Sequence, residues 1–291
     1  MKKLSMVLVL ALLLGLVGCS APETTPEIIA TTKPVYDFTT RLCKGANIAT
    51  GLLISESVSC LHDYSLNVSQ VKAAEGAQVM VISGAGLEDF MQELINRCDT
   101  VIDSSAGIPL LECAEEHDHE HDHEHHHEAD AHIWLAPENT KIMAVNICEG
   151  LCLAFPDQKH TFKENLASLI EDLDALQIYG EETLSSLSCR EMVTFHDGFS
   201  YFAHAFDLSI AAAMEEESGS EASAKELIHL IQLMQQHHIP SVFTEINGSV
   251  SAANIISAEI GTASYALDMG MSGDYFEIMR HNINTVKEAL G

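Results

Sequence analysis

Short apolar runs alternate with stretches of helical periodicity through the first half of the chain. The apolar runs predict strands at 28–31, 48–54, 79–83 and 101–103. The periodic stretches between them predict helices at 35–43, 68–76 and 87–96. This order of strands and helices favours a parallel sheet covered by helices.

The same alternation restarts in the second half. It predicts strands at 192–195, 208–213, 242–244 and 263–267, and helices at 224–238, 250–260 and 275–290. Between the halves, 157–187 carries apolar residues at helical spacing, with no proline and one glycine, Gly180. That pattern predicts one long helix. We therefore expect an α/β fold in which two parallel-sheet βα lobes are joined by a long rigid helix, with a cleft between the lobes.

The first residues carry the pattern of a secretory signal. Two lysines precede an apolar run at 4–17 that is short for a transmembrane helix. The run ends in Leu16-Val17-Gly18-Cys19, which resembles the bacterial lipobox, where the chain is cut before a cysteine that becomes lipidated. An ordinary signal peptide with an incidental cysteine is the alternative. The predicted division of the chain is signal peptide 1–18, lipidated tether 19–27, first lobe 28–156 with a histidine-rich loop at 112–130, connecting helix 157–187 and second lobe 188–291.

Charge narrows the classes of partner. The chain has 14 basic and 43 acidic residues, which gives a formal net charge of -29. Binding to nucleic acid needs a basic face, so nucleic acid is excluded as a partner. Adhesion of the folded body to anionic lipid is disfavoured for the same reason. The charge is compatible with attracting cations over distance, and equally with solubility alone.

Cysteine usage leaves the redox state open. Lipidation of Cys19 would leave seven of the 8 cysteines, an odd number, and their spacings form no zinc-ribbon pattern. Buried free thiols are the default interpretation. A disulfide between Cys43 and Cys98 is the alternative.

Four candidate metal ligands follow predicted strands or the histidine-rich segment. They are His62, His132, His196 and Asp268. In open parallel sheets, ligands bind beyond the carboxyl ends of the strands, so a cleft between the lobes would gather these residues. Three imidazoles and one carboxylate complete a tetrahedral zinc site and leave no position for a catalytic water. A lone histidine, by contrast, is more often structural.

The motifs around these residues resemble those of the ABC-transporter substrate-binding proteins for zinc and manganese, the cluster A-I metal-binding proteins. The matching segments are His62-Asp63-Tyr64, Ser83 to Glu88, Asp130 to Pro137, Phe195 to Phe202, Phe243-Thr244-Glu245 and Leu267-Asp268. The resemblance covers roughly 28–291. It implies two βα lobes joined by one long helix, with a metal ion held in the cleft by His62, His132, His196 and Asp268. It also implies an ABC permease as the partner.

The chain departs from the pattern of that family at three places. Family members usually carry a proline a few residues after the first histidine, where this chain has 65–68. Ala131 stands where a proline is usual, and Ala136 where an aspartate is frequent. None of these changes removes a ligand. Glu245 is the reserve carboxylate for Asp268, although a supporting role behind the ligands suits it better.

The segment 112–130 points to zinc. Its histidines are His117, His119, His121, His123, His125, His126 and His127, interspersed with acidic residues. Such a low-complexity stretch builds no packed core, and we expect a disordered loop with weak, redundant metal sites. In the resembled family this loop is typical of zinc members. A solvated acidic loop without function is the alternative.

The predicted function is therefore extracytoplasmic capture of Zn²⁺ with high affinity and its delivery to an ABC importer. The protein would be a monomer, anchored to the cell membrane through Cys19, and not an enzyme. The alternatives are a manganese-binding member of the same family, a surface adhesin and a secreted zinc hydrolase. A hydrolase would need an open coordination position and a general base, and the chain has no His-Glu-x-x-His pattern.

Overall fold

The computed structural model describes residues 25–55, 64–111, 129–214 and 223–291 of the 291-residue chain. Within them lie two four-stranded parallel sheets, which confirms the expected fold class. The first sheet contains β1 (Ile28–Ala30), β2 (Thr50–Leu52), β3 (Val79–Ile82) and β4 (Val101–Asp103). The second contains β5 (Glu191–Thr194), β6 (Ser209–Ala213), β7 (Ser241–Glu245) and β8 (Ala263–Leu267).

Both sheets have the same strand order. It is β2-β1-β3-β4 in the first sheet and β6-β5-β7-β8 in the second. In each, the chain adds one strand on one side and then two on the other, so the topological switch point lies between β1 and β3, and between β5 and β7. A ligand site is expected in the crevice beyond the carboxyl ends of the strands at such a point.

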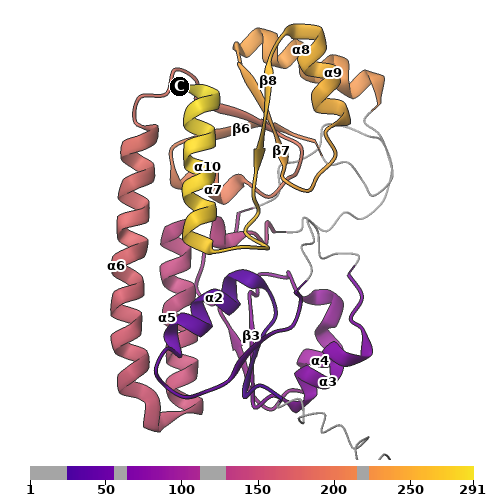
Figure 1. Cartoon of the computed structure of the whole chain (residues 1–291). Helices are drawn as coiled ribbons and strands as arrows, with labels where there is room; N and C mark the ends of the chain where they lie inside the picture. Colours follow the sequence, from indigo (N-terminus) through magenta and orange to yellow (C-terminus); the bar gives the residue numbers. More distant parts are fainter. Residues whose placement is uncertain (1–24, 56–63, 112–128, 215–222) are drawn as a thin grey trace, which may run out of the picture.

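Helices cover the sheets and join them. The α-helices are α2 (Lys33–Leu42), α3 (Val68–Gly76), α4 (Gln92–Ile95), α5 (Pro137–Ala154), α6 (Lys159–Leu184), α7 (Ser200–Ala205), α8 (Ala224–His237), α9 (Ser251–Ile260) and α10 (Tyr275–Leu290). The 3₁₀ helices are η1 (Asp89–Met91), η2 (Ile133–Leu135) and η3 (Pro156–Gln158). Figure 1 shows α6 running the length of the molecule beside α5 at one end and α10 at the other. None of the helices in the described residues has the length and apolar character needed to cross a bilayer.

The long helix is fitted to the second lobe at its one glycine. A Cβ atom on Gly180 would lie 2.2 Å from Cε1 of Phe206, which follows α7 and is buried. Glycine therefore allows the Phe206 ring to pack directly on the backbone of α6. This contact fixes the second lobe against the helix that the first lobe also uses, because α6 packs on α2 and α5 as well.

Several elements differ from the sequence-based expectation. The helix expected at 87–96 is the short pair η1 and α4, because the chain leaves β3 through a turn with positive φ at Gly84, Ala85 and Gly86. The strand expected at 48–54 shortens to β2. Helix α7 was not predicted, since six residues are too few for periodicity to identify a helix.

The alternative disulfide is not formed. Cys43 and Cys98 are free thiols, and so are Cys148, Cys152 and Cys189. Cys43 and Cys148 are buried, as the default interpretation expected. Burial raises the pKa of the Cys43 thiol to about 12, so this group is an inert apolar side chain at neutral pH.

Candidate metal site

Two of the four predicted ligands lie side by side. The ring centroids of His132 and His196 are 5.1 Å apart, and the rings meet edge to face at 85°. His132 is the residue before η2, in the first half of the chain, and His196 follows β5 of the second sheet. His196 thus lies at the switch point of the second sheet, and His132, from the first half of the chain, lies beside it.

Each of these imidazoles is held at Nδ1 by a buried carboxylate. Asp130 Oδ1 lies 2.8 Å from Nδ1 of His132 and also accepts the His132 backbone N–H at 2.9 Å. Glu245 Oε1, at the end of β7, lies 3.2 Å from Nδ1 of His196. The side chains of Asp130 and Glu245 are 0% and 7% exposed. The hydrogen bond to Asp130 fixes the His132 tautomer that carries its proton at Nδ1 and leaves Nε2 as the metal-binding nitrogen. Glu245 lies within ion-pair distance of Nδ1 of His196 and favours the same orientation of that ring.

Asp130 was missed as a supporting residue by the sequence reasoning. Its signal is the spacing, because an aspartate two residues before a histidine can bind both the backbone N–H and the ring of that histidine. For His196 the sequence favoured Glu245 in a supporting role behind the ligands. The structure gives Glu245 that position.

Gly198 lets the two imidazoles approach the segment after β8. A Cβ atom there would lie 2.7 Å from His196 Cδ2, 2.8 Å from His132 Nδ1 and 2.6 Å from Met269 Cε. Only glycine fits among three such neighbours without moving them. The Met269 side chain, which follows Asp268, and both imidazoles therefore surround Gly198.

Asp268 itself is placed by its backbone. Its N–H donates to Asn282 Oδ1 at 2.9 Å, and Asn282 Nδ2 donates to its carbonyl at 2.8 Å. Its Oδ1 accepts the N–H of Gly270 at 2.8 Å. Among the described residues no group of three or more His, Cys, Asp or Glu side chains is arranged to hold a metal ion. The structure thus brings His132 and His196 together and does not add the Asp268 carboxylate to them.

His62 lies outside the described residues, but the chain on either side of it is tied together. Gln70 Nε2, on α3, donates to the carbonyl of Leu53 at 2.9 Å and to the hydroxyl of Tyr64 at 2.8 Å. Gln70 therefore joins the described residues on either side of His62, and Leu53 directly follows β2, at the edge of the sheet where a ligand is expected.

The histidine-rich segment also starts and ends at one place. The backbone N–H of Asp130 donates to the carbonyl of Leu111 at 3.0 Å, two residues from His132. The seven histidines His117, His119, His121, His123, His125, His126 and His127 lie outside the described residues, as does Cys19. Their segment is nevertheless joined to the fold beside the imidazole pair.

The family of the chain is decided by comparison with known proteins. The model of the periplasmic zinc-uptake complex component A, ZnuA, matches residues 28–289. The chain belongs to the ZnuA family. This confirms the resemblance drawn from the motifs. Members of this family are substrate-binding components and not enzymes, so the hydrolase alternative is wrong.

Individual ZnuA-family relatives share both sequence and fold. The zinc-binding lipoprotein AdcA of Streptococcus pneumoniae is 30% identical over 99% of this chain, which spans 61% of the length of that relative. A crystal structure of ZnuA is 28% identical, with a TM-score of 0.79 over 91% of this chain and 100% of that one. The Zn(II)-bound structure of S. pneumoniae AdcA is 27% identical, with a TM-score of 0.76 over 91% of this chain and 58% of that one.

A second polar centre of this ZnuA-family chain lies at the switch point of the first sheet. Glu88 is 2% exposed, and its carboxylate accepts hydrogen bonds from the Thr31 hydroxyl (2.5 Å), Ser83 N (2.7 Å) and Gly84 N (2.9 Å). Burial raises the pKa of Glu88 to about 7, against the lowering effect of those three donors. Glu88 thereby connects the end of β1 to the turn after β3.

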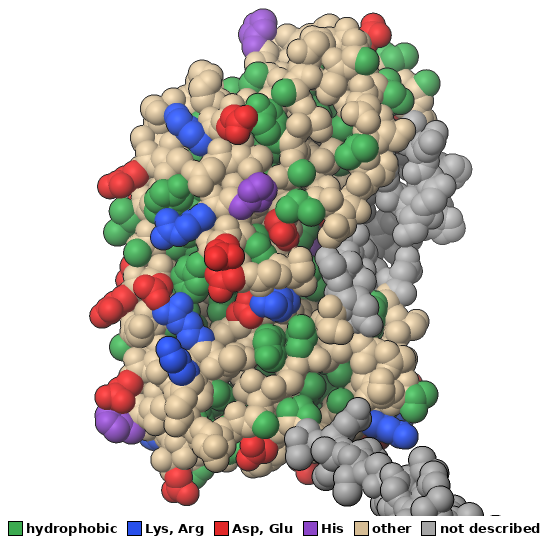
Figure 2. Space-filling view, in the orientation of Figure 1, with side chains coloured by type: hydrophobic (Ala, Val, Ile, Leu, Met, Phe, Trp, Pro, Cys, Tyr) green, Lys and Arg blue, Asp and Glu red, His purple; other side chains and the backbone are tan. Residues whose placement is uncertain are grey.

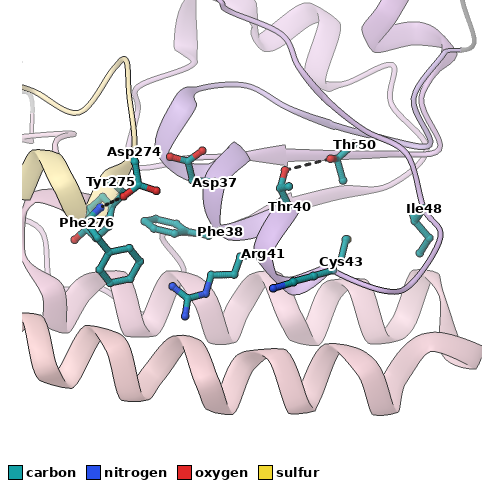
Figure 3. Close-up of a pocket in the computed structure, with 11 residues that line it drawn as sticks. Asp37, Phe38, Thr40, Arg41, Cys43, Ile48, Thr50, Asp274, Tyr275 and Phe276 are labelled. Carbon is teal, nitrogen blue, oxygen red and sulfur yellow. Dashed lines mark hydrogen bonds between the residues drawn. The ribbon is translucent and has the colours of Figure 1, made fainter.

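A groove of about 450 Å³ lies elsewhere, between α2 and the start of α10 (Figure 3). The close-up shows Phe38 and Tyr275 at one end and Arg41 reaching toward Phe276. The Arg41 guanidinium lies 5.1 Å from the Phe276 ring centroid and is paired with Asp172 of α6. None of the described predicted ligands lines this groove, so it is not part of the histidine site.

Proposed function

We propose that the chain captures Zn²⁺ in the cleft between its lobes and delivers it to an ABC importer. The observation that carries the proposal is the imidazole pair, His132 and His196, each with a buried carboxylate at Nδ1. Two imidazoles that each present Nε2 to a metal ion are suited to a borderline metal such as zinc. The zinc-uptake family and the zinc-binding relatives support the same cargo.

The proposed ligand set is His62, His132, His196 and Asp268. Three imidazoles and a carboxylate suit zinc, whereas manganese, the alternative cargo, prefers more oxygen ligands. Glu245 is already engaged with Nδ1 of His196, which supports a positioning role for it and leaves Asp268 as the fourth ligand. Binding would then require the Asp268 carboxylate and His62 to join the pair.

The proposed location is the outer side of the cell membrane. Residues 1–18 would be removed as a signal peptide, and Cys19 would be lipidated at the start of the tether 19–27. The S. pneumoniae relative is named a lipoprotein, which supports this proposal. Acyl chains contribute roughly 0.8 kcal/mol per buried methylene, so a multiply acylated terminus stays on the membrane. The folded part would comprise lobes 28–156 and 188–291 with the connecting helix 157–187, acting as a monomer.

Competition calorimetry tests the site directly. Zn²⁺ and Mn²⁺ are titrated separately into the chain from Ser20 onward, in the presence of a chelator of known affinity. We expect one tight zinc equivalent that disappears in His196→Ala. The matched control is His160→Ala, because His160 is 86% exposed on α6 and far from the pair in the chain. Tight Mn²⁺ with weak Zn²⁺ would overturn the cargo, and unchanged tight zinc binding in His196→Ala would overturn the site.

A further inference from the structure

The single tryptophan of the chain contacts both His132 and the segment that follows Asp268. Trp134 is the central residue of η2, two positions after His132, and it is fully buried. Its ring meets the His132 ring at 63°, with 5.4 Å between the centroids. Its carbonyl accepts hydrogen bonds from the Tyr275 hydroxyl at 2.9 Å and from Thr140 Oγ1 at 3.0 Å.

The indole also reaches the other half of the chain. Nε1 of Trp134 donates to the carbonyl of Met269 at 2.7 Å, and Met269 directly follows Asp268. Gly270 completes this contact, because it has φ +80° and a Cβ atom there would lie 3.2 Å from Trp134 Nε1. Trp134 is thus attached through its backbone to the element that carries His132, and through its indole to the segment that carries Asp268.

We propose that Trp134 is a positioning residue of the metal site, one that holds the Asp268 segment in register with His132. This inference rests on the proposed zinc-binding function. Asn282 fixes the Asp268 backbone from α10, within the second half of the chain, but that contact does not relate Asp268 to His132. The indole hydrogen bond does, since it joins η2 to the residue after Asp268. A ligand held in place before binding pays less ordering entropy, so its metal is retained longer.

An isosteric replacement isolates this hydrogen bond. Because the chain has one tryptophan, growth of a tryptophan auxotroph on β-(3-benzothienyl)alanine replaces residue 134 alone and exchanges the indole N–H for sulfur. Trp134→Phe is the second variant. The matched control is Tyr179→Phe, which removes another 2.7 Å hydrogen bond, from Tyr179 to Asn284, between α6 and α10. Zinc release is followed by stopped flow into a chromogenic chelator, and Co²⁺ absorption reports the ligand geometry.

The expected result is zinc release about tenfold faster in both residue-134 variants, the effect of one lost hydrogen bond of ordinary strength. Their Co²⁺ bands should shift in the same direction as those of Asp268→Ala, while Tyr179→Phe behaves as the unmodified protein. Unchanged release and an unchanged Co²⁺ spectrum in the folded benzothienylalanine protein would overturn the inference alone. Absence of tight zinc binding in the unmodified protein would instead overturn the proposed function.

Discussion

Two carboxylates determine which nitrogen of each imidazole in the pair faces a metal ion. Asp130 and Glu245 both lie against an Nδ1 nitrogen, and both are buried, so a flip of either ring would move that nitrogen away from a buried carboxylate. Nε2 of each ring is therefore the nitrogen presented to a metal ion. The two carboxylates come from separate elements, a loop before η2 and the end of β7. Their shared feature is that each orients an imidazole.

Glu245→Gln tests this arrangement. The amide has the same shape but no charge to complement the imidazole, and zinc affinity should fall about tenfold to a hundredfold. Competition calorimetry measures the change. Glu191→Gln is the matched control, because Glu191 makes the same contact at 3.1 Å with Nδ1 of His237 on the exposed surface. An unchanged affinity would exclude the positioning role, and complete loss of binding would make Glu245 a ligand.

Helices and strands were predicted best where nearby residues in the sequence, such as helix caps, determine their bounds. The helix at 68–76 has the bounds expected, and it opens with Asn67 and Gln70 in a reciprocal capping box. The helix expected at 224–238 opens with a capping box that Ser223 forms with Glu226. The turn after β3 was missed because its geometry depends on Glu88, whose side chain accepts N–H groups from the turn itself. A contact between a carboxylate and backbone four or five residues earlier has no periodic signal in the sequence.

The pH dependence of stability follows from Glu88. Its pKa of about 7 in the fold exceeds the ordinary glutamate pKa of 4.5, so its contribution to the free energy of unfolding is fully present below pH 4.5 and is lost as pH rises through 7. The shift corresponds to about 3 kcal/mol. In Glu88→Gln, which cannot ionise, this loss should vanish, although the variant is less stable because the amide cannot accept from all three donors.

Urea unfolding from pH 5 to 8 measures the slope of the free energy of unfolding against pH. Equal slopes in the two proteins would refute the assignment, and the exposed Glu93→Gln should keep the slope of the unmodified protein.

Gly180 couples the long helix to the second lobe. Gly180→Ala should gain up to about 1 kcal/mol of helix propensity but lose about 1–3 kcal/mol to overlap with the Phe206 ring, a net destabilisation. Thermal or urea unfolding measures it. In Phe206→Leu the ring that overlaps is gone, so the same glycine substitution should cost less there. Equal costs in the two backgrounds would show that the contact with Phe206 does not limit residue 180.

At the scale of the whole molecule, the sequence predicted two βα lobes, the long helix and the general place of the site. It predicted His132 and His196 as members of one ligand set, His196 from its position after a strand and His132 from its position after the histidine-rich segment. It could not predict that Trp134 joins the two halves, since that contact links positions 135 residues apart. Figure 2 shows acidic and basic side chains interspersed on one face, so net charge alone locates no surface.

The histidine-rich segment should act on the number of zinc ions bound and not on the tight site. We expect the low-complexity segment to pay ordering entropy for each ion that it binds, so its sites should be weaker than the proposed primary site. The residues that flank it, Leu111 and Asp130, are hydrogen-bonded to each other, and Asp130 lies two residues before His132. Deletion of 115–128 should therefore remove the weak equivalents in a zinc titration and leave one tight equivalent.

The deletion experiment has to distinguish the loss of acidic charge from the loss of histidine ligands. Seven of the 43 acidic residues lie in 115–128, so the deletion changes the net charge from -29 to -22 and weakens long-range attraction of cations as well. A full-length variant with the seven loop histidines replaced by glutamine keeps the acidic residues. If imidazoles hold the extra zinc, this variant should titrate like the deletion at low and high salt. Loss of the tight equivalent in either protein would mean that the loop supplies a ligand to the primary site, and the four-residue set would then be wrong.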